Sequence, residues 1–355
     1  MEYVFDGMGG SQSSPAMINK TRNRHLTPLS PEETPFARLS PERVLDAAAS
    51  AGLDPDGRLF ALNSYENRVY QLGSSEGTLV LKFYRPARWS DAQILEEHGF
   101  TAELAAAELP VAAPVTVSGQ TLLRHREFRF AAFPYLRGSA PELDAPEARE
   151  LLGRSLARLH QVGARRPFER RPEIGVERLG VQSRSLVLES DLLPEALREQ
   201  YERLSGLLLE RAERVYREVG SVGRLRLHGD CHLGNLLWNE RGPIFVDLDD
   251  CAMGPRIQDL WMLLSGPPAD QQAQWAALLN GYQQFADFDF RELRLVEPLR
   301  GLRMLHHAAW VCHRWPDPAF PRAFPWFGEP RYWEGYLGDL REQLAVIDEP
   351  PLLAG

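Results

Sequence analysis

Lysine is almost absent from this sequence. Only two of its 40 basic residues, Lys20 and Lys82, are lysines, and arginine fills the other positions. Lys20 belongs to a polar N-terminal stretch, whereas Lys82 lies within the apolar residues 78–84, which are typical of a strand. A lysine in this strand, in a chain that otherwise uses arginine, indicates a functional role that needs a compact charge on a flexible side chain. The plainer alternative is a lysine that extends from an edge strand to solvent.

Cysteine and excess positive charge are also lacking. The three cysteines, Cys231, Cys251 and Cys312, include no Cys-x-x-Cys pair and cannot form a disulfide framework. With 40 basic against 49 acidic residues the net charge is −9, which argues against nucleic acid as a partner. No apolar run approaches the ~18 residues that cross a bilayer, and the first twenty residues do not resemble a secretory signal. We therefore expect a cytoplasmic protein without a membrane partner, and most readily an enzyme.

The pattern along the chain predicts two lobes after a flexible extension. Residues 1–35 are rich in Gly, Ser, Pro, Asn and Thr, which is typical of a mobile segment. Residues 36–136 contain short strand-like runs and one helix that starts near Ser90, whereas residues 137–355 are mostly helical. The strand-like runs of the first lobe are 69–72, 79–84, 115–117 with 120–124, and 128–133. This arrangement is typical of an α+β protein with a small β-rich lobe and a larger helical lobe.

The densest group of polar residues follows two strand-like segments in the second lobe. An apolar segment ends in His228-Gly229-Asp230, Asn235 comes five residues later, and the next apolar segment ends in Asp247. Carboxylate and amide oxygens are the ligands that Mg²⁺ prefers, and Mg²⁺ often takes only one or two of them from the protein. A further carboxylate can orient and deprotonate a hydroxyl. With Lys82 upstream, this order predicts phosphotransfer, with Asp230 as the base and with Asn235 and Asp247 as metal ligands.

The neighbours of these residues support plainer interpretations. Asp249 and Asp250 either join the site or are solvated and cap the next helix. His228 is expected to be a structural histidine that shapes the loop. Cys231 and His232 have no matching pair elsewhere in the sequence, so we reject a zinc site.

The same residues resemble a known family. His228-Gly229-Asp230 with Asn235 and Asp247 is similar to the catalytic loop and metal-binding aspartate of the aminoglycoside phosphotransferase/choline kinase-like enzymes, a branch of the protein-kinase-like fold. Longer segments are similar to the bacterial stress response kinase A family, over nearly the whole chain from about residue 41 to residue 351. These segments are residues 62–70, 82–86, 94–98, 245–250, 258–263 and 317–321.

The resemblance implies a role for each matching residue on the nucleotide side. Lys82 would hold the α- and β-phosphates of ATP, paired with an acid of the following helix. Glu97 fits that acid best and Glu96 is the alternative. Ser64 would contact phosphate from the preceding loop.

On the side of the acceptor, the resemblance implies that Asp230 is the base and that Asn235 and Asp247 hold Mg²⁺. Asp259 would brace the catalytic loop.

Two features depart from the general kinase pattern. The phosphate loop, residues 63–67, contains no glycine, and only 12 residues separate Asp247 from Asp259. The second gap is too short for a phosphorylatable activation segment, so we predict no on–off switch of that kind.

The predicted reaction is Mg²⁺-dependent transfer of the γ-phosphoryl group of ATP to a hydroxyl. The resemblance implies a Ser/Thr protein kinase of the bacterial stress response that also phosphorylates itself. Nothing in the sequence resembles a coiled-coil seam, so we expect a monomer. The residues alone equally allow a kinase for a small molecule such as choline, homoserine or an aminoglycoside. The aromatic residues of the C-terminal region, from Trp310 to Trp333, either cage a cationic amine or pack against helices. A non-catalytic nucleotide-binding scaffold is the remote alternative, because it would not need Lys82, Asp230, Asn235 and Asp247 together.

Overall fold

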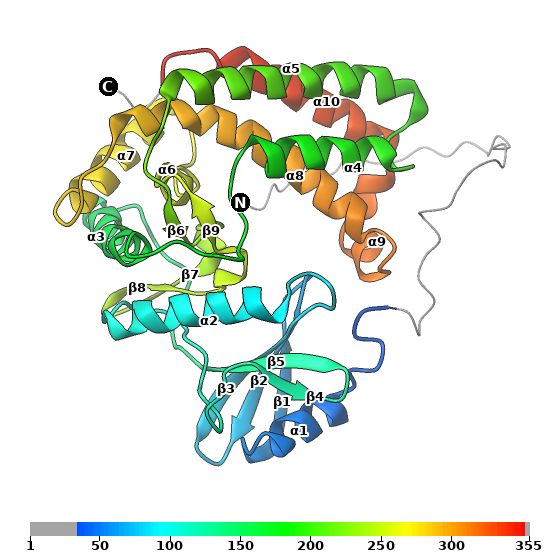
Figure 1. The fold of residues 1–355 in the computed structure, drawn as a ribbon, viewed down its shortest axis with the longest axis vertical. Helices are drawn as coiled ribbons and strands as arrows, with labels where there is room; N and C mark the ends of the chain where they lie inside the picture. The colour runs from blue at the N-terminus through cyan, green and yellow to red at the C-terminus, as the bar shows by residue number, and fades with distance from the viewer. Residues whose placement is uncertain (1–33, 352–355) are drawn as a thin grey trace, which may run out of the picture.

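The computed structural model describes residues 34–351, so the extension expected over residues 1–35 lies almost entirely outside them. Two lobes are stacked along the long axis, with the β-rich lobe below and the helical lobe above in Figure 1. The chain therefore has the two-lobed α+β architecture that its sequence pattern predicts.

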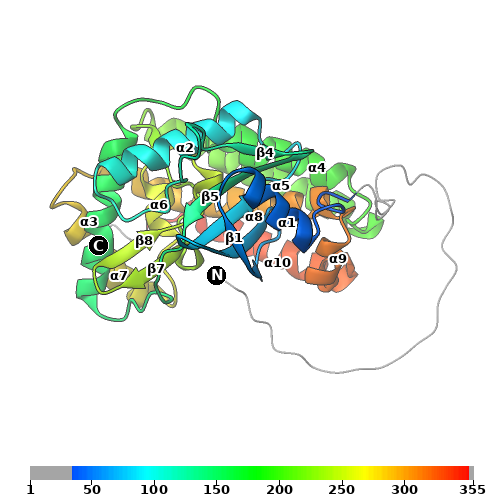
Figure 2. The same cartoon turned by 90° about the horizontal axis from the view of Figure 1, so that it is seen from below.

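The small lobe is built on an antiparallel sheet in the order β1-β2-β3-β5-β4. Its strands are β1 (Pro55–Leu62), β2 (Arg68–Ser74), β3 (Gly77–Phe83), β4 (Leu123–His125) and β5 (Phe128–Pro134). Two helices cover its two faces. Helix α1 (Pro41–Ser50) lies on the outer side in Figure 2, and α2 (Asp91–Ala106) lies between the sheet and the helical lobe in Figure 1.

Alternation along β3 decides which face each side chain occupies. Leu81 and Phe83 pack with Val44 of α1, whereas Ala131 and Phe133 of β5 pack with Ile94 of α2. Lys82 pairs with Ala131 across the sheet and so faces α2. Ser90 caps α2 in a reciprocal capping box with Gln93, which fixes where the helix begins.

The structure corrects the expected strands at two places. The residues 115–117 form no strand, because Val117 makes only an isolated bridge to Gln120, and β4 begins at Leu123. Strand β1, which was not expected, lies at the sheet edge with most of its side chains exposed. Its sequence therefore lacks the buried alternation that identifies a half-buried strand.

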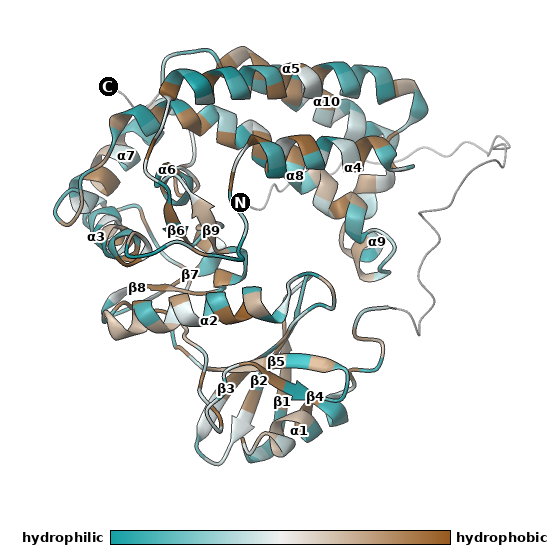
Figure 3. Ribbon diagram, in the orientation of Figure 1, coloured by the Kyte–Doolittle hydropathy of each residue, from teal (hydrophilic) through white to brown (hydrophobic). Residues whose placement is uncertain are grey.

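The helical lobe consists mainly of α-helices, joined by single helical turns and short strands. The α-helices are α3 (Pro146–Gly163), α4 (Ser183–Glu189), α5 (Glu195–Val219), α6 (Ile257–Trp261), α7 (Pro268–Tyr282), α8 (Val296–Arg314), α9 (Ala319–Ala323) and α10 (Pro330–Val346). A π-helical turn, η1 (Val176–Gln182), precedes α4. Helix α5 carries a mixed hydrophilic and hydrophobic surface in Figure 3, and its buried residues include Tyr201, Leu204 and Leu208.

Two small strand pairs position the polar segments next to the interface between the lobes. Strand β6 (Leu225–Leu227) pairs with β9 (Ala252–Gly254), and β7 (Leu236–Asn239) pairs with β8 (Gly242–Phe245). The loop from β6 to β7 and the loop from β8 to β9 carry the residues that the sequence singles out.

The aromatic C-terminal region forms a packed cluster. Trp333 is fully buried and contacts Tyr201, Phe327 and Tyr336 edge-on. Of the helices in residues 34–351, none has the length and apolar character to cross a membrane.

Candidate active site

The loop that follows β6 is held rigidly by one buried carboxylate. Asp259 of α6 accepts hydrogen bonds of 2.8 Å from the backbone N–H groups of both His228 and Gly229, and His160 of α3 lies 3.2 Å from the same carboxylate. Gly229 has a φ of +85°, and a Cβ there would lie 2.3 Å from the carbonyl oxygen of Asp250. The close approach of the two loops therefore requires glycine at this position.

Asp230 comes next in this loop, and its carboxylate has two cationic or polar neighbours. Its Oδ1 accepts a hydrogen bond of 2.7 Å from Nη1 of Arg303 on α8, and its Oδ2 lies 3.4 Å from Nε2 of His232. Burial alone would raise the pKa of the Asp230 carboxyl, but His232 and Arg303 together hold that pKa well below its ordinary value. The carboxylate is thus ionised at neutral pH and can accept a hydrogen bond from a hydroxyl.

Asn235 and Asp247 offer oxygens that suit a divalent cation. Nδ2 of Asn235 donates to the backbone oxygen of Asp230 at 3.0 Å, which leaves the amide oxygen available. Asp247 has left-handed backbone dihedrals, φ 56° and ψ 60°, and its side chain is 55% exposed. Residues 34–351 contain no group of three or more His, Cys, Asp or Glu side chains arranged to hold a metal. Two hard oxygens fit Mg²⁺, which fills its remaining positions with water and phosphate oxygens.

Lys82 is shared between three carboxylates. Its Nζ lies 2.9 Å from Asp247, 3.1 Å from Asp249 and 3.5 Å from Glu97. Burial disfavours the charge, but the three carboxylates raise the pKa of Lys82 well above its ordinary value. Burial raises the pKa of Glu97 to about 7 despite the attraction of Lys82. The ammonium therefore lies where β3, α2 and the loop after β8 meet.

The neighbouring acid, Glu96, faces elsewhere. Its carboxylate accepts hydrogen bonds from the backbone N–H groups of residues 169–171, at 2.7 to 3.0 Å. Of the two acids considered for Lys82, the structure places Glu97 beside it and uses Glu96 to hold a loop of the helical lobe.

Asp249 belongs to the site more fully than the sequence suggested. Its side chain is only 3% exposed, and it contacts Lys82, Arg88 and Asn67, with Nδ2 of Asn67 at 3.1 Å. Arg88 also holds Asp250 at 2.8 Å. The sequence signal for Asp249 is the Asp-Leu-Asp order after β8. It is incomplete, because the arginine and the asparagine that hold Asp249 lie far away in the sequence.

Ser64 lies in the loop between β1 and β2, and its side chain bonds to none of these residues. In the same loop, Glu66 accepts hydrogen bonds from Trp310 Nε1 at 2.8 Å and Arg314 Nε at 2.7 Å. Arg85 lies 2.8 Å from the same carboxylate and 2.9 Å from Asp317. These contacts, which we call the latch, tie the small lobe to α8 and to the turn before α9.

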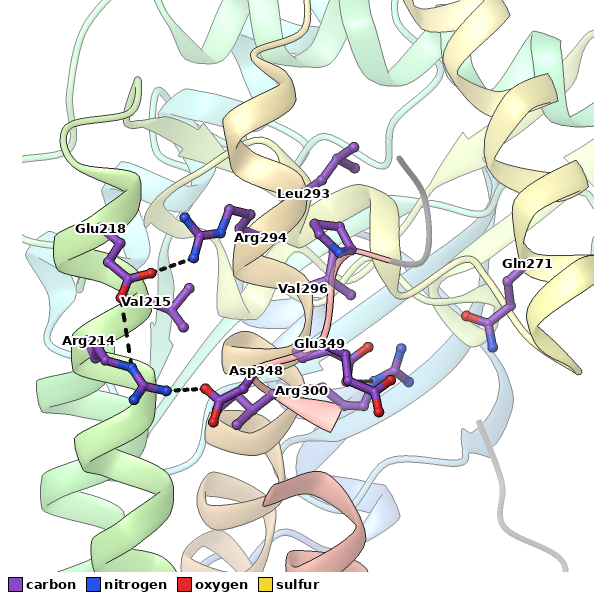
Figure 4. Close-up of a pocket in the computed structure, with 13 residues that line it drawn as sticks. Arg214, Val215, Glu218, Gln271, Leu293, Arg294, Val296, Arg300, Asp348 and Glu349 are labelled. Atoms are coloured by element: carbon purple, nitrogen blue, oxygen red, sulfur yellow. Dashed lines mark hydrogen bonds and ion pairs between the residues drawn. The ribbon is translucent and has the colours of Figure 1, made fainter. Parts of the chain in front are cut away.

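A separate pocket of about 260 Å³ lies away from this site, between α5, α8 and the end of α10 (Figure 4). Arg214, Glu218, Arg294 and Asp348 link its walls by ion pairs. None of its lining residues belongs to the site around Lys82.

The two lobes, with the lysine of β3 facing the acid of α2, define a protein-kinase-like phosphotransferase. The chain belongs to the phosphotransferase enzyme family, whose sequence model matches residues 59–296, and it is a kinase.

Two bacterial kinases indicate more closely which members of this family the chain resembles. The chain is 45% identical over 318 residues to stress response kinase A of Escherichia coli K12, covering 89% of this chain and 96% of that relative. It is 44% identical over the same length to the Salmonella typhimurium serine/threonine protein kinase RdoA, with the same coverage.

Solved structures share the fold at low sequence identity. An amicoumacin kinase in complex with AMP-PNP, Ca²⁺ and Ami superposes with a TM-score of 0.68 at 19% identity, covering 88% of this chain and 95% of that one. A microcompartment-associated aminopropanol kinase gives a TM-score of 0.64 at 19% identity, covering 86% and 98%.

Proposed function

We propose that this kinase transfers the γ-phosphoryl group of ATP, with Mg²⁺, to serine or threonine hydroxyls of proteins, itself included. The observation that carries the proposal is the meeting of Lys82, Asp247, Asn235 and Asp230 at the interface of the lobes. The names of the bacterial relatives support a protein acceptor and a role in the stress response.

The residues of the site fit the steps of such a transfer. The ionised carboxylate of Asp230 orients the acceptor hydroxyl and takes its proton as the new O–P bond forms and the bond from the γ-phosphorus to ADP breaks. Lys82 holds the α- and β-phosphates, and Glu97 keeps Lys82 in place. Asn235 and Asp247 would hold Mg²⁺, which would neutralise charge on the phosphates. Catalysis is thus mainly positioning and electrostatic stabilisation.

The test is phosphotransfer from γ-labelled ATP by the full chain, with Mg²⁺ and a generic Ser/Thr protein. We expect label on that protein and on the kinase itself, and loss of both in Asp230→Asn and on removal of Mg²⁺ with a chelator. Nucleotide binding by Asp230→Asn shows that the variant is folded.

A small-molecule hydroxyl kinase is the second candidate, because the solved structures with this fold include kinases named for small molecules. Tight Mg-ATP binding without any label on protein favours it. Failure to bind nucleotide at all contradicts both candidates.

A further inference from the structure

The phosphate loop keeps its position without a glycine. Residues 63–67 include none, and no residue of this stretch has a positive φ, so its backbone adopts dihedrals that any side chain allows. In protein kinases a glycine-rich loop covers the phosphates of ATP. Other contacts must therefore hold the loop of this chain in a defined place.

Arg85, which follows β3, holds the backbone of the loop. Its Nε donates to the carbonyl oxygen of Glu66 at 2.9 Å, and its Nη2 donates to that of Tyr65 at 3.1 Å. In a trans peptide the N–H points away from the C=O, so the N–H groups of Glu66 and Asn67 point away from this guanidinium. Neither N–H donates to a backbone carbonyl within residues 34–351. The loop thus keeps two backbone donors of the kind that suits anionic oxygens.

Asn67 connects the loop to the helical lobe. Its amide oxygen accepts from the backbone N–H of Arg85 at 3.1 Å, and its Nδ2 donates to Oδ2 of Asp249 at 3.1 Å. The backbone N–H can only donate and the carboxylate can only accept, so both ends of the amide are matched to their partners. The side chain of Asn67 is only 4% exposed, and water therefore competes little for either hydrogen bond.

Asp249 continues this connection to the site. Its Oδ1 lies 3.1 Å from Nζ of Lys82, whereas its Oδ2 accepts the hydrogen bonds from Asn67 and Arg88. Asp247 precedes it by two residues in the same loop, after β8. One carboxylate therefore links the phosphate loop with the lysine and with the loop that carries the predicted metal ligand.

The contact between Asn67 and Asp249 is more specific than stability requires. A buried hydrogen bond adds little net stability, and apolar side chains of similar shape often stabilise such a place equally well. An amide that donates to a carboxylate fixes a direction as well as a distance. The contact is therefore suited to set the position of the phosphate loop relative to Lys82.

We propose that Asn67 and Asp249 are positioning residues: their hydrogen bond sets the phosphate loop against Lys82 and against the loop that carries the metal ligand. On the ATP-dependent transfer proposed above, on which this inference rests, the contact aligns the phosphates of Mg-ATP and leaves the adenosine part of the nucleotide unaffected. It gives a loop without glycine the fixed place from which its backbone donors meet the phosphates.

The test measures the dissociation constants of Mg-ATP and of adenosine for the full chain and its variants. Asn67→Asp keeps an oxygen that accepts from Arg85 but sets a second carboxylate against Asp249. We expect this variant to bind Mg-ATP roughly tenfold more weakly, since one hydrogen bond to a charged group has about that effect, and to bind adenosine as the wild type does. In labelled transfer, kcat/KM for ATP should fall by at least the same factor. A purely structural role would weaken the binding of both ligands together.

Exchange of the two groups tests the contact directly. Asp249→Asn alone should also weaken Mg-ATP binding, because Lys82 loses a charged partner. In the double variant Asn67→Asp/Asp249→Asn the new amide can donate to the new carboxylate, so the loss should be smaller than the product of the two single losses. A loss equal to that product means that the two residues act independently, which overturns the proposal.

Asn280→Asp is the matched control. Asn280 of α7 donates to Glu150 at 2.7 Å on the exposed surface, so this variant makes the same change from amide to carboxylate away from the site. Both dissociation constants should stay at their wild-type values. If Asn67→Asp does not fold, Asn67→Ser removes the donor without adding a charge, and it should still weaken the binding of Mg-ATP and not that of adenosine.

Two results contradict the positioning role directly. Wild-type affinity for Mg-ATP in Asn67→Asp overturns it, and so does an equal loss of affinity for Mg-ATP and adenosine. Failure of the wild type to bind Mg-ATP contradicts the function proposed above, and this inference falls with it.

Discussion

At the scale of single residues, Glu96 and Glu97 provide a test of the nucleotide side. Both are glutamates of α2, but only Glu97 contacts Lys82, whereas Glu96 accepts backbone hydrogen bonds. Glu97→Gln should reduce kcat/KM for ATP by roughly thirtyfold, because losing a charged partner costs about 2 kcal/mol of positioning. Steady-state kinetics with varied ATP measure this effect. Glu96→Gln is the control, and an equal loss in both variants would contradict the assigned pairing.

Gly229 offers a second residue-scale test, because its backbone has a positive φ and also touches the next loop. Gly229→Ala places a Cβ 2.3 Å from the carbonyl oxygen of Asp250 and should cost at least about 2 kcal/mol of unfolding free energy. The displaced Asp230 should also slow phosphotransfer. Urea unfolding and the labelled-ATP assay measure the two effects.

Gly119→Ala is the matched control for Gly229→Ala. Gly119 has a similar φ of +78° but nothing within 4 Å of the added Cβ, so we expect a cost of only about 1 kcal/mol and full activity. Equal costs at the two positions would show that the close approach to Asp250 is unimportant.

At the scale of elements, the sequence predicts the helices, strands and site residues whose signals lie close together in the chain. The capping serine of α2 and the alternation around Lys82 are short-range signals, and they locate the helix and strand that hold Lys82 and Glu97. Asp230, Asn235 and Asp247 stand out because their spacing is local. Strand β1 gives no such signal, since an exposed edge strand needs no alternation.

The remaining side chains around the site could not be predicted because their positions depend on packing between distant elements. Arg88 lies in the turn between β3 and α2 and Arg303 lies on α8, and each is one arginine among many in the sequence. Only the fold brings Arg303 next to Asp230 and Arg88 next to Asp250.

The latch is the element-scale feature with the clearest energetic consequence. Asp317 accepts from Arg85 at 2.9 Å, and both side chains are almost fully buried. Asp317→Asn removes the charge but keeps the shape, so the Arg85 guanidinium loses one of its two carboxylates. We expect the unfolding free energy to fall by about 2–3 kcal/mol, measured by urea unfolding. Glu334→Gln on exposed α10 surface is the control, and a change below about 0.5 kcal/mol in Asp317→Asn would contradict a structural role.

At the scale of the whole molecule, the two lobes are joined by more than the chain that connects them. Lys82 and Arg88 reach carboxylates of the helical lobe on one side of the site, and the latch joins the lobes again through α8. Charge pairs between the lobes therefore surround the site, and the protonation of buried groups near it affects the stability of the whole fold.

Two histidines near this interface, the buried His98 and the half-buried His306, are held neutral, and their effect on stability has a definite sign. Loss of solvent contact together with nearby arginines, and for His98 also Lys82, lowers the pKa of His98 to about 3 and that of His306 to about 4. In the unfolded chain each titrates near 6.5. Between these values only the unfolded chain binds the proton, so each histidine lowers stability as the pH falls from about 6.5 to about 4.

His306→Gln isolates one of these contributions. The variant cannot take up that proton when it unfolds, so its stability should fall less steeply than the wild type's between pH 6.5 and 4, by up to about 1.4 kcal/mol per pH unit. Urea unfolding at several pH values measures both slopes. At pH 8 the histidine is neutral in both states, so any difference there reflects the loss of packing and of the contact with Ser183, 3.2 Å away. Parallel curves for the two proteins from pH 8 to pH 4 would mean that His306 is protonated in the folded state, and that its arginine neighbours do not control its charge.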